Sequence, residues 1–272
     1  MGLTVRLGLL LAALVAVLVT AGFVAGASSD STSAVPAETI YVRNVAQQYI
    51  SDATIRRDIP AWEQAVNHDF APVWHTTHYR LVFIGRRQAP AGALSAVFVT
   101  KGPVKGALAY HTVTAGAPQI VVYAGTADYY GYDNSVSFTH ELFELAADPM
   151  ISVTNQGWPY DYIWYPHPNG TINRESQTEG TVWAQEVCDP VESDSYRIDG
   201  VKISDFVTPD WFNDEVNGPY DHMGLVQQPF TILPGGYAQF WDGMSWNLVE
   251  NFRGVTTPDA AGFLKGESRE RP

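Results

Sequence analysis

The stretch from Ser135 to Pro149 constrains the fold more than any other part of the chain, because it combines a helical apolar pattern with embedded polar residues. Bulky apolar residues recur at helical spacing, and Ser135 or Ser137 can cap the N-terminus of the helix. Pro149 ends it, because the residue before a proline is driven out of the helical region. Three polar residues stand inside this apolar run: His140, Glu141 and Glu144.

His140 and Glu144 are four residues apart, so on a helix they project from one face, one turn apart. Their imidazole and carboxylate can reach one cation, whereas Glu141 points about 100° round the helix. The pattern is a relative of the His-Glu-x-x-His zinc motif, in which the first glutamate activates the metal-bound water. It predicts His140 and Glu144 as metal ligands and Glu141 as the catalytic base. The alternative is a solvated helix edge.

Catalytic zinc usually takes a third protein ligand, and the segment from Thr178 to Pro190 offers candidates. We expect a second short helix here with Glu186 as the third ligand, and Asp189 is the alternative. Asp148 is excluded, because a straight helix would place it about 12 Å from His140 along the axis. The other interpretations are a solvated loop and a separate calcium site, since calcium prefers oxygen ligands. The acidic residues that could form it are Asp189, Glu192, Asp194 and Asp199.

Cys188 lies beside these acidic residues and is the single cysteine of the chain, so no internal disulfide can form. We expect it to be a small buried residue, with a thiolate ligand as the alternative. The formal net charge of −13 makes nucleic acid and anionic membrane surfaces poor partners.

The N-terminus predicts a targeting segment. Arg6 precedes an apolar run from Leu7 to Val24, and an Ala-x-Ala pattern ends at Ala27. We expect residues 1–27 to be a signal peptide, and an uncleaved membrane anchor is the alternative, because the run is nearly long enough to span a bilayer. Either interpretation places the rest of the chain outside the cytoplasm, as a secreted or anchored protein.

The remaining sequence predicts an α+β fold. Residues 38–71 read as helical, with a second helix that opens at Pro60. Strands are expected over 80–85, 95–100 and 118–123, with the segment 106–111 before the last of them. His111 would follow a strand that runs near the His140 helix, and we expect it to be structural, with contact to substrate as the alternative. We expect a mixed sheet packed against the His140 helix, followed by an aromatic-rich irregular C-terminal half. Residues 28–37 would be a flexible leader, 38–250 a single domain and 251–272 a charged tail.

Several blocks together resemble a family of poorly characterised zincin-like proteins from bacteria and their phages, which carries the pattern His-Glu-x-x-Glu-x-x-x-Asp-Pro. The blocks lie at residues 106–111, 137–149, 186–192, 203–212 and 233–237, and the resemblance covers roughly residues 60–245. It implies a zincin-like fold with an edge strand before the active helix, and it names no substrate. Glu144 stands where the wider metallopeptidase pattern has histidine.

These observations predict a secreted zinc-dependent metallopeptidase-like protein. His140, Glu144 and Glu186 would hold zinc, and Glu141 would deprotonate the bound water for attack on a peptide or protein substrate. The alternative is a catalytically inactive binding or structural module that a metal, zinc or calcium, stabilises. A third hypothesis is glycan binding by the aromatic residues between Trp158 and Tyr165.

Overall fold

The structure is a computed structural model, and it describes residues 37–103, 107–151, 162–166, 172–176, 181–213, 216–242, 246–252 and 255–259. The predicted signal peptide or anchor, residues 28–36 of the predicted leader and residues 260–272 of the predicted tail lie outside the described residues. So do Trp158 and most of the predicted aromatic loop. None of the helices in the described ranges has the length and apolar character needed to span a membrane.

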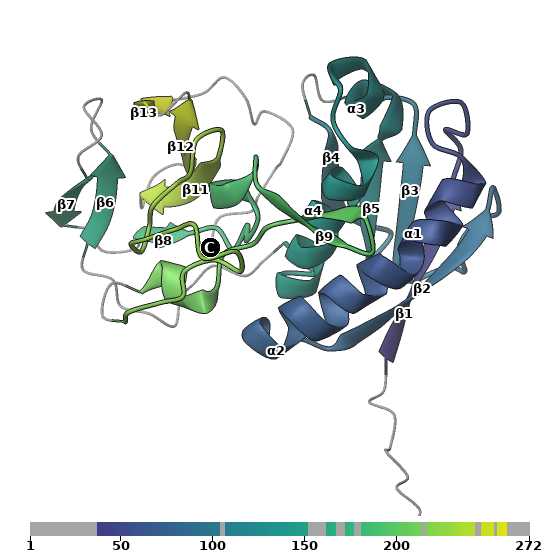
Figure 1. Cartoon of the computed structure of the whole chain (residues 1–272), viewed down its shortest axis with the longest axis horizontal. Coiled ribbons are helices and arrows are strands. Elements are labelled where there is room, and N and C mark those ends of the chain that lie inside the picture. The colour runs from purple at the N-terminus through teal and green to yellow at the C-terminus, as the bar shows by residue number, and fades with distance from the viewer. Residues whose placement is uncertain are drawn as a thin grey trace, which may run out of the picture. The chain divides into compact units, whose positions relative to one another are not determined.

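A five-stranded mixed sheet carries the predicted helix, α4 (Asn134–Ala147), on one face (Figure 1). Its strands are β1 (Ala37–Asn44), β2 (His78–Gly85), β3 (Ser95–Val99), β4 (Ala109–Thr114) and β5 (Ala117–Tyr123). The order is β2-β1-β3-β5-β4, with β4 antiparallel at the edge and the other strands parallel. The predicted α+β class, with a mixed sheet against the active-site helix and an edge strand before it, is confirmed. His111 lies within β4 and does not follow it.

The prediction of a helix from residue 38 is wrong, because residues 37–44 form β1 in the middle of the sheet. Its side chains alternate between buried and more exposed, and Ile40, Val42 and Asn44 face the core. That period of two is the pattern of a strand. The apparent helical spacing that begins at Val42 combined the last residues of this strand with residues of the turn that follows it.

The first helix is α1 (Asp52–Gln64), and Ser51 caps it by accepting a hydrogen bond from the Thr54 amide. Pro60 lies inside α1, so the prediction that it opens a second helix is also wrong. An interior proline removes one helical hydrogen bond, at a cost of about 3 kcal/mol. The burial of Ile55 and Trp62 on the core side of α1 offsets that cost. The π-helical turn η1 (Ala65–Phe70) and the short α2 (Ala71–Trp74) continue the chain.

Helix α4 (Asn134–Ala147) follows the short α3 (Ala124–Tyr130), and its cap is Asp133, which accepts from the Ser135 amide. The prediction of a serine cap is therefore wrong. The Ser135 hydroxyl makes tertiary contacts instead, because it accepts from Trp62 Nε1 at 2.7 Å and donates to the Lys202 carbonyl at 2.6 Å. These bonds tie α4 to α1 and to the strand that carries Lys202.

The apolar side of α4 packs into an aromatic core. The ring centroids of Phe138 and Trp62 are 4.3 Å apart, and those of Phe143 and Phe70 are 4.9 Å apart with nearly parallel planes. Phe98 from β3 stacks on both Trp62 and Phe138, so α1 and α4 share one face of the sheet. This packing holds α4 in one orientation and thereby fixes the direction of its polar side.

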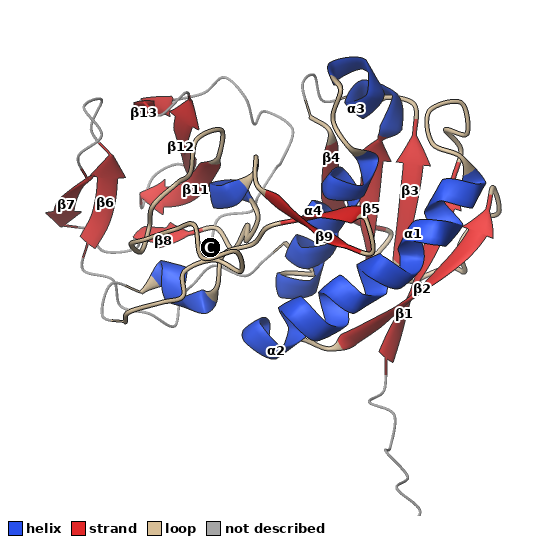
Figure 2. Ribbon diagram, in the orientation of Figure 1, coloured by secondary structure: helices blue, strands red, loops and turns tan. Residues whose placement is uncertain are grey.

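After α4 the described chain is made of strands, loops and short 3₁₀ turns, as Figure 2 shows. A second sheet has the order β13-β12-β11-β8, and two hairpins pair β6 with β7 and β9 with β10. The strand bounds are β6 (Tyr162–Pro166), β7 (Ile172–Ser176), β8 (Thr181–Trp183), β9 (Ser195–Ile198), β10 (Val201–Ser204), β11 (Tyr237–Asp242), β12 (Trp246–Phe252) and β13 (Val255–Asp259). The 3₁₀ turns are η2 (Asp189–Val191) and η3 (Pro209–Phe212).

The predicted short helix through Trp183 is wrong, because Thr181–Trp183 is the edge strand β8 and pairs with β11. The Trp183 ring packs against the rings of Trp211, Phe230 and Phe240, and that cluster determines the conformation of the strand. It forms the predicted aromatic-rich C-terminal region. Strands β12 and β13 continue to Asp259, which lies within the predicted charged tail.

Candidate metal centre

The polar side of α4 is buried. His140, Glu141 and Glu144 are only 7%, 6% and 3% exposed, which excludes the solvated helix edge. The i, i+4 spacing brings the two side chains together as predicted, because His140 Nε2 lies 3.2 Å from Glu144 Oε1. Burying ionisable groups is costly unless they are paired or coordinated, so this helix face requires partners from elsewhere in the chain.

The segment between β8 and β9 supplies two of these partners. Asp189 Oδ1 lies 3.3 Å from His140 Nε2, and Glu192 Oε2 lies 3.0 Å from His140 Nδ1. The two ring nitrogens of His140 therefore face different carboxylates. Nε2 points between Glu144 and Asp189, while Nδ1 points to Glu192.

Backbone hydrogen bonds hold this segment against α4. The Cys188 amide donates to Glu144 Oε1 at 3.2 Å, and the Val207 amide donates to the Val187 carbonyl at 2.7 Å. The Cys188 thiol donates to the His140 carbonyl at 3.6 Å and is fully buried, as expected for a small core residue. Glu186 lies in the loop before η2, so it does not come from a second helix.

A further histidine reaches the site from the edge strand. His111 Nδ1 lies 3.1 Å from Glu141 Oε2 and 3.8 Å from Glu144 Oε2. The sequence interpretation missed these contacts, because it placed His111 after the strand and took it as structural. Strand pairing could have revealed them, since His111 pairs with Ile120 and cross-strand partners share a face of the sheet. A core-facing Ile120 places His111 toward α4.

Three overlapping groups bring potential ligand atoms within 4.8 Å of one another. They are His140 with Glu144 and Cys188, His111 with Glu144 and Glu186, and His140 with Asp189 and Glu192. We call their residues, together with Glu141, the His140 cluster. All the predicted site residues belong to the His140 cluster. Glu186, however, is grouped with His111 and Glu144 and not with His140. The alternative ligand, Asp189, is the acid that contacts His140. The cluster could hold a metal ion.

In the His140 cluster several acidic side chains lie close together in the interior, and this environment shifts their pKa values. Burial raises the pKa of Glu141 to about 8 and, with the neighbouring Glu144, raises that of Asp189 to about 7. Burial also raises the pKa of Glu144, and it does so despite the opposing effect of His140. Burial would lower the pKa of His140, but the carboxylates of Glu144 and Glu192 outweigh it and raise that pKa well above its ordinary value. Without a cation the cluster therefore retains protons, which metal binding would displace.

Comparisons of the chain with protein family models, curated proteins and solved structures find no match. The resemblance to a zincin-like family stays an expectation from the sequence blocks. The structure adds the buried group of histidine and glutamate side chains, which is compatible with a metal site.

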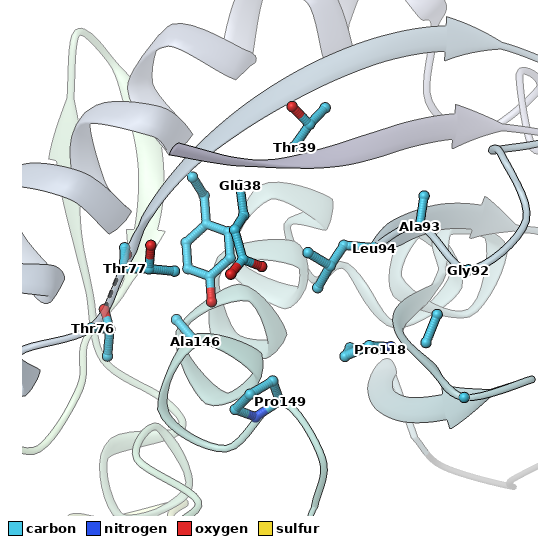
Figure 3. Close-up of a pocket in the computed structure, with 13 residues that line it drawn as sticks. Glu38, Thr39, Thr76, Thr77, Gly92, Ala93, Leu94, Pro118, Ala146 and Pro149 are labelled. Carbon is cyan, nitrogen blue, oxygen red and sulfur yellow. Dashed lines mark hydrogen bonds between the residues drawn. The ribbon is translucent and has the colours of Figure 1, made fainter. Parts of the chain in front are cut away.

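An open pocket lies at the C-terminal end of α4 (Figure 3). Glu38, Thr39 and Leu94 come to it from the start of the sheet, and Ala146 and Pro149 come from the end of the helix. None of its lining residues belongs to the His140 cluster. The candidate chemistry therefore belongs to the buried cluster and not to this pocket.

Proposed function

We propose that the chain is an extracytoplasmic zinc-dependent hydrolase of metallopeptidase type, with zinc held by His140, Glu144 and Asp189. The observation that carries this proposal is the position of His140 Nε2, which lies 3.2 Å from Glu144 Oε1 and 3.3 Å from Asp189 Oδ1. One imidazole nitrogen with a carboxylate oxygen of each acid beside it supplies the donor types of the three-ligand protein set of a catalytic zinc. Asp189 takes the place that the sequence interpretation assigned to Glu186.

Glu192 supports this assignment from the other side of the imidazole ring. An ionised carboxylate only accepts hydrogen bonds, so Glu192 near His140 Nδ1 favours the tautomer that carries its proton there. Once a metal displaces the second proton, the lone pair would lie on Nε2, toward Glu144 and Asp189. Zinc-binding histidines commonly have such a carboxylate partner.

The donor types favour zinc over calcium. Calcium sites are built from oxygen ligands, whereas the His140 cluster includes two imidazoles and a thiol. Burial raises the pKa of the Cys188 thiol well above its ordinary value, so the sulfur stays protonated unless a metal binds it. Carboxylate and imidazole ligands are therefore the first choice for the ion.

Glu141 is the proton acceptor in this proposal. Zinc supplies Lewis-acid chemistry, because it polarises a carbonyl group and lowers the pKa of water. His111 Nδ1, 3.1 Å from Glu141 Oε2, orients the Glu141 carboxylate and leaves its second oxygen to take a proton. A positively charged ion beside Glu141 would lower its pKa from the raised metal-free value and leave it ionised as a base.

The second candidate is a structural metal site in a binding module. The group of His140, Glu144 and Cys188 favours it, because a thiolate could close the coordination shell in place of water. A structural site has four protein ligands, whereas a catalytic site keeps one position for water or substrate. In that case the ion would stabilise the fold without hydrolysis.

The test is zinc content by plasma mass spectrometry on the purified chain and on Glu144→Gln, Glu141→Gln and Cys188→Ala, followed by a peptide-hydrolysis screen. The proposal expects zinc to be lost in Glu144→Gln and retained in the other two variants, with hydrolysis abolished in Glu141→Gln. Zinc that depends on Cys188, with no hydrolysis by any variant, would favour the structural site. A zinc content indifferent to Glu144 would overturn both candidates.

A further inference from the structure

Glu144 faces a different histidine with each of its two oxygens. Oε1 lies 3.2 Å from His140 Nε2, and Oε2 lies 3.8 Å from His111 Nδ1. His140 comes from α4 and His111 from β4, so the carboxylate stands between two imidazoles on different elements. A carboxylate in that position can bind one metal ion through each oxygen.

A second ligand set exists on the His111 side. His111, Glu144 and Glu186 bring one potential ligand atom each within 4.8 Å of the others, and this set shares only Glu144 with the proposed zinc ligands. Asp189 is the second acid beside His140, and Glu186 is the second acid beside His111. One short chain segment therefore supplies an acid to each side of Glu144.

The two histidines have the same kind of partner at Nδ1. Glu192 Oε2 lies 3.0 Å from His140 Nδ1, and Glu141 Oε2 lies 3.1 Å from His111 Nδ1. A carboxylate beside the imidazole is a common partner of metal-binding histidines and orients the ring. The same arrangement of imidazole and carboxylate therefore stands on both sides of Glu144.

We propose that the His140 cluster is a two-metal site bridged by Glu144, with His140 and Asp189 on one ion and His111 and Glu186 on the other. This inference rests on the proposed function for its first ion and adds the second. Divalent transition metals such as zinc suit both sets, because each offers one imidazole and carboxylates. Paired ions of this kind lie roughly 3.5–4 Å apart in hydrolases and stabilise both the attacking and the leaving oxygen.

The test is a titration of the metal-free full chain with cobalt(II), read by plasma mass spectrometry after gel filtration and by electron paramagnetic resonance. We expect two equivalents per chain with a signal weakened by magnetic coupling between the ions. Glu186→Gln and His111→Gln should each lose one equivalent and regain the signal of an isolated ion. Asp205→Asn removes a buried carboxyl outside the cluster and should keep both equivalents.

The outcomes separate this inference from the proposed function. One equivalent that survives Glu186→Gln and His111→Gln but is lost in His140→Gln would overturn the second ion and leave the first. No bound metal in a chain whose circular dichroism shows a folded protein would overturn both. Two equivalents without magnetic coupling would overturn the bridge by Glu144.

Discussion

The chain contains two groups of buried acids, and they are stabilised in different ways. In the His140 cluster the carboxylates face imidazoles and one another, as in the contacts of His140 with Glu144 and Asp189. In the second group, Asp205 and Asp221 are also fully buried but accept hydrogen bonds from nearby backbone amides. The comparison separates acids that backbone amides hold in a loop from acids that could hold a cation.

Backbone amides hold three of the four carboxylate oxygens of the Asp205–Asp221 pair. Asp205 Oδ1 accepts from the amides of Phe206 and Met223 at 2.8 and 3.2 Å, and Asp221 accepts from the amides of Leu225 and Val226 at 2.9 Å each. Burial and a hydrogen bond to Asp221 raise the pKa of Asp205 to about 8, so the pair shares a proton. Among the described residues, neither acid belongs to the groups that could hold a metal ion.

The largest loss of stability should come from disrupting the Asp205–Asp221 pair, which backbone amides hold in place. Asp221→Ala leaves two amides without their acceptor and Asp205 without its partner, and we expect a loss of about 3 kcal/mol in the free energy of unfolding. The measurement is urea denaturation, and the control is zinc content, which should not change. A loss below about 1 kcal/mol would contradict the structural role of the pair.

The second prediction tests the cation that the His140 cluster is proposed to bind. With free zinc about 100-fold above its Kd, zinc should stabilise the wild-type chain by about 2.7 kcal/mol, and a chelator should remove that stabilisation. In Glu144→Gln the chelator should have little effect, because the shared ligand is lost. An equal effect of the chelator on both proteins would show that zinc acts elsewhere.

A third prediction concerns pH. The pKa of Asp205 in the folded chain, about 8, exceeds that of an ordinary aspartate, about 3.9, so the folded state holds a proton that the unfolded state has released. Its contribution is complete below about pH 4 and is lost as the pH rises toward 8, by up to about 1.4 kcal/mol per pH unit. In Asp205→Asn the side-chain amide can donate to Asp221 at every pH, so this part of the loss should disappear.

The measurement compares the free energy of unfolding at pH 6 and pH 7 for wild type and Asp205→Asn. Groups in the His140 cluster titrate in both proteins. The difference between the two proteins in how the free energy of unfolding changes with pH therefore measures the contribution of the Asp205–Asp221 pair. Identical slopes would contradict the shared proton.

The smallest effect should come from Glu192, whose side chain is 32% exposed at the edge of the His140 cluster. Glu192→Gln keeps an acceptor for His140 Nδ1 but removes the charge, so we expect zinc affinity to fall at most about tenfold, or about 1.4 kcal/mol. Competition with a calibrated chelator measures it. A complete loss of zinc would make Glu192 a ligand and not a positioning residue.

Local patterns in the sequence were sufficient for several elements. The helix around His140, the contact between His140 and Glu144 and the strands β2, β3 and β5 all follow from spacing within a few residues. The hairpin of β9 and β10 was predicted from Asp199-Gly200, and both residues have the positive φ that such a turn requires. Side chains close in sequence have few ways to meet, so these predictions were reliable.

Other features depended on which distant segments meet. The cap of α4 changed because Trp62 and Lys202 use the Ser135 hydroxyl, and β1 is a strand because it fits between β2 and β3 in the sheet. Glu144 and Cys188 are 44 residues apart, yet their hydrogen bond helps determine which acid reaches His140.

The sequence by itself therefore determined a buried helix with a metal-binding pattern and an α+β class, because helix periodicity and burial are local properties of the residues. Only the tertiary structure decided that Asp189 contacts His140, that Glu186 is grouped with His111, and that His111 joins the cluster from an edge strand. The physical reason is that ligand geometry is set by the packing of separate elements to within about an ångström, and a linear pattern contains no such distances.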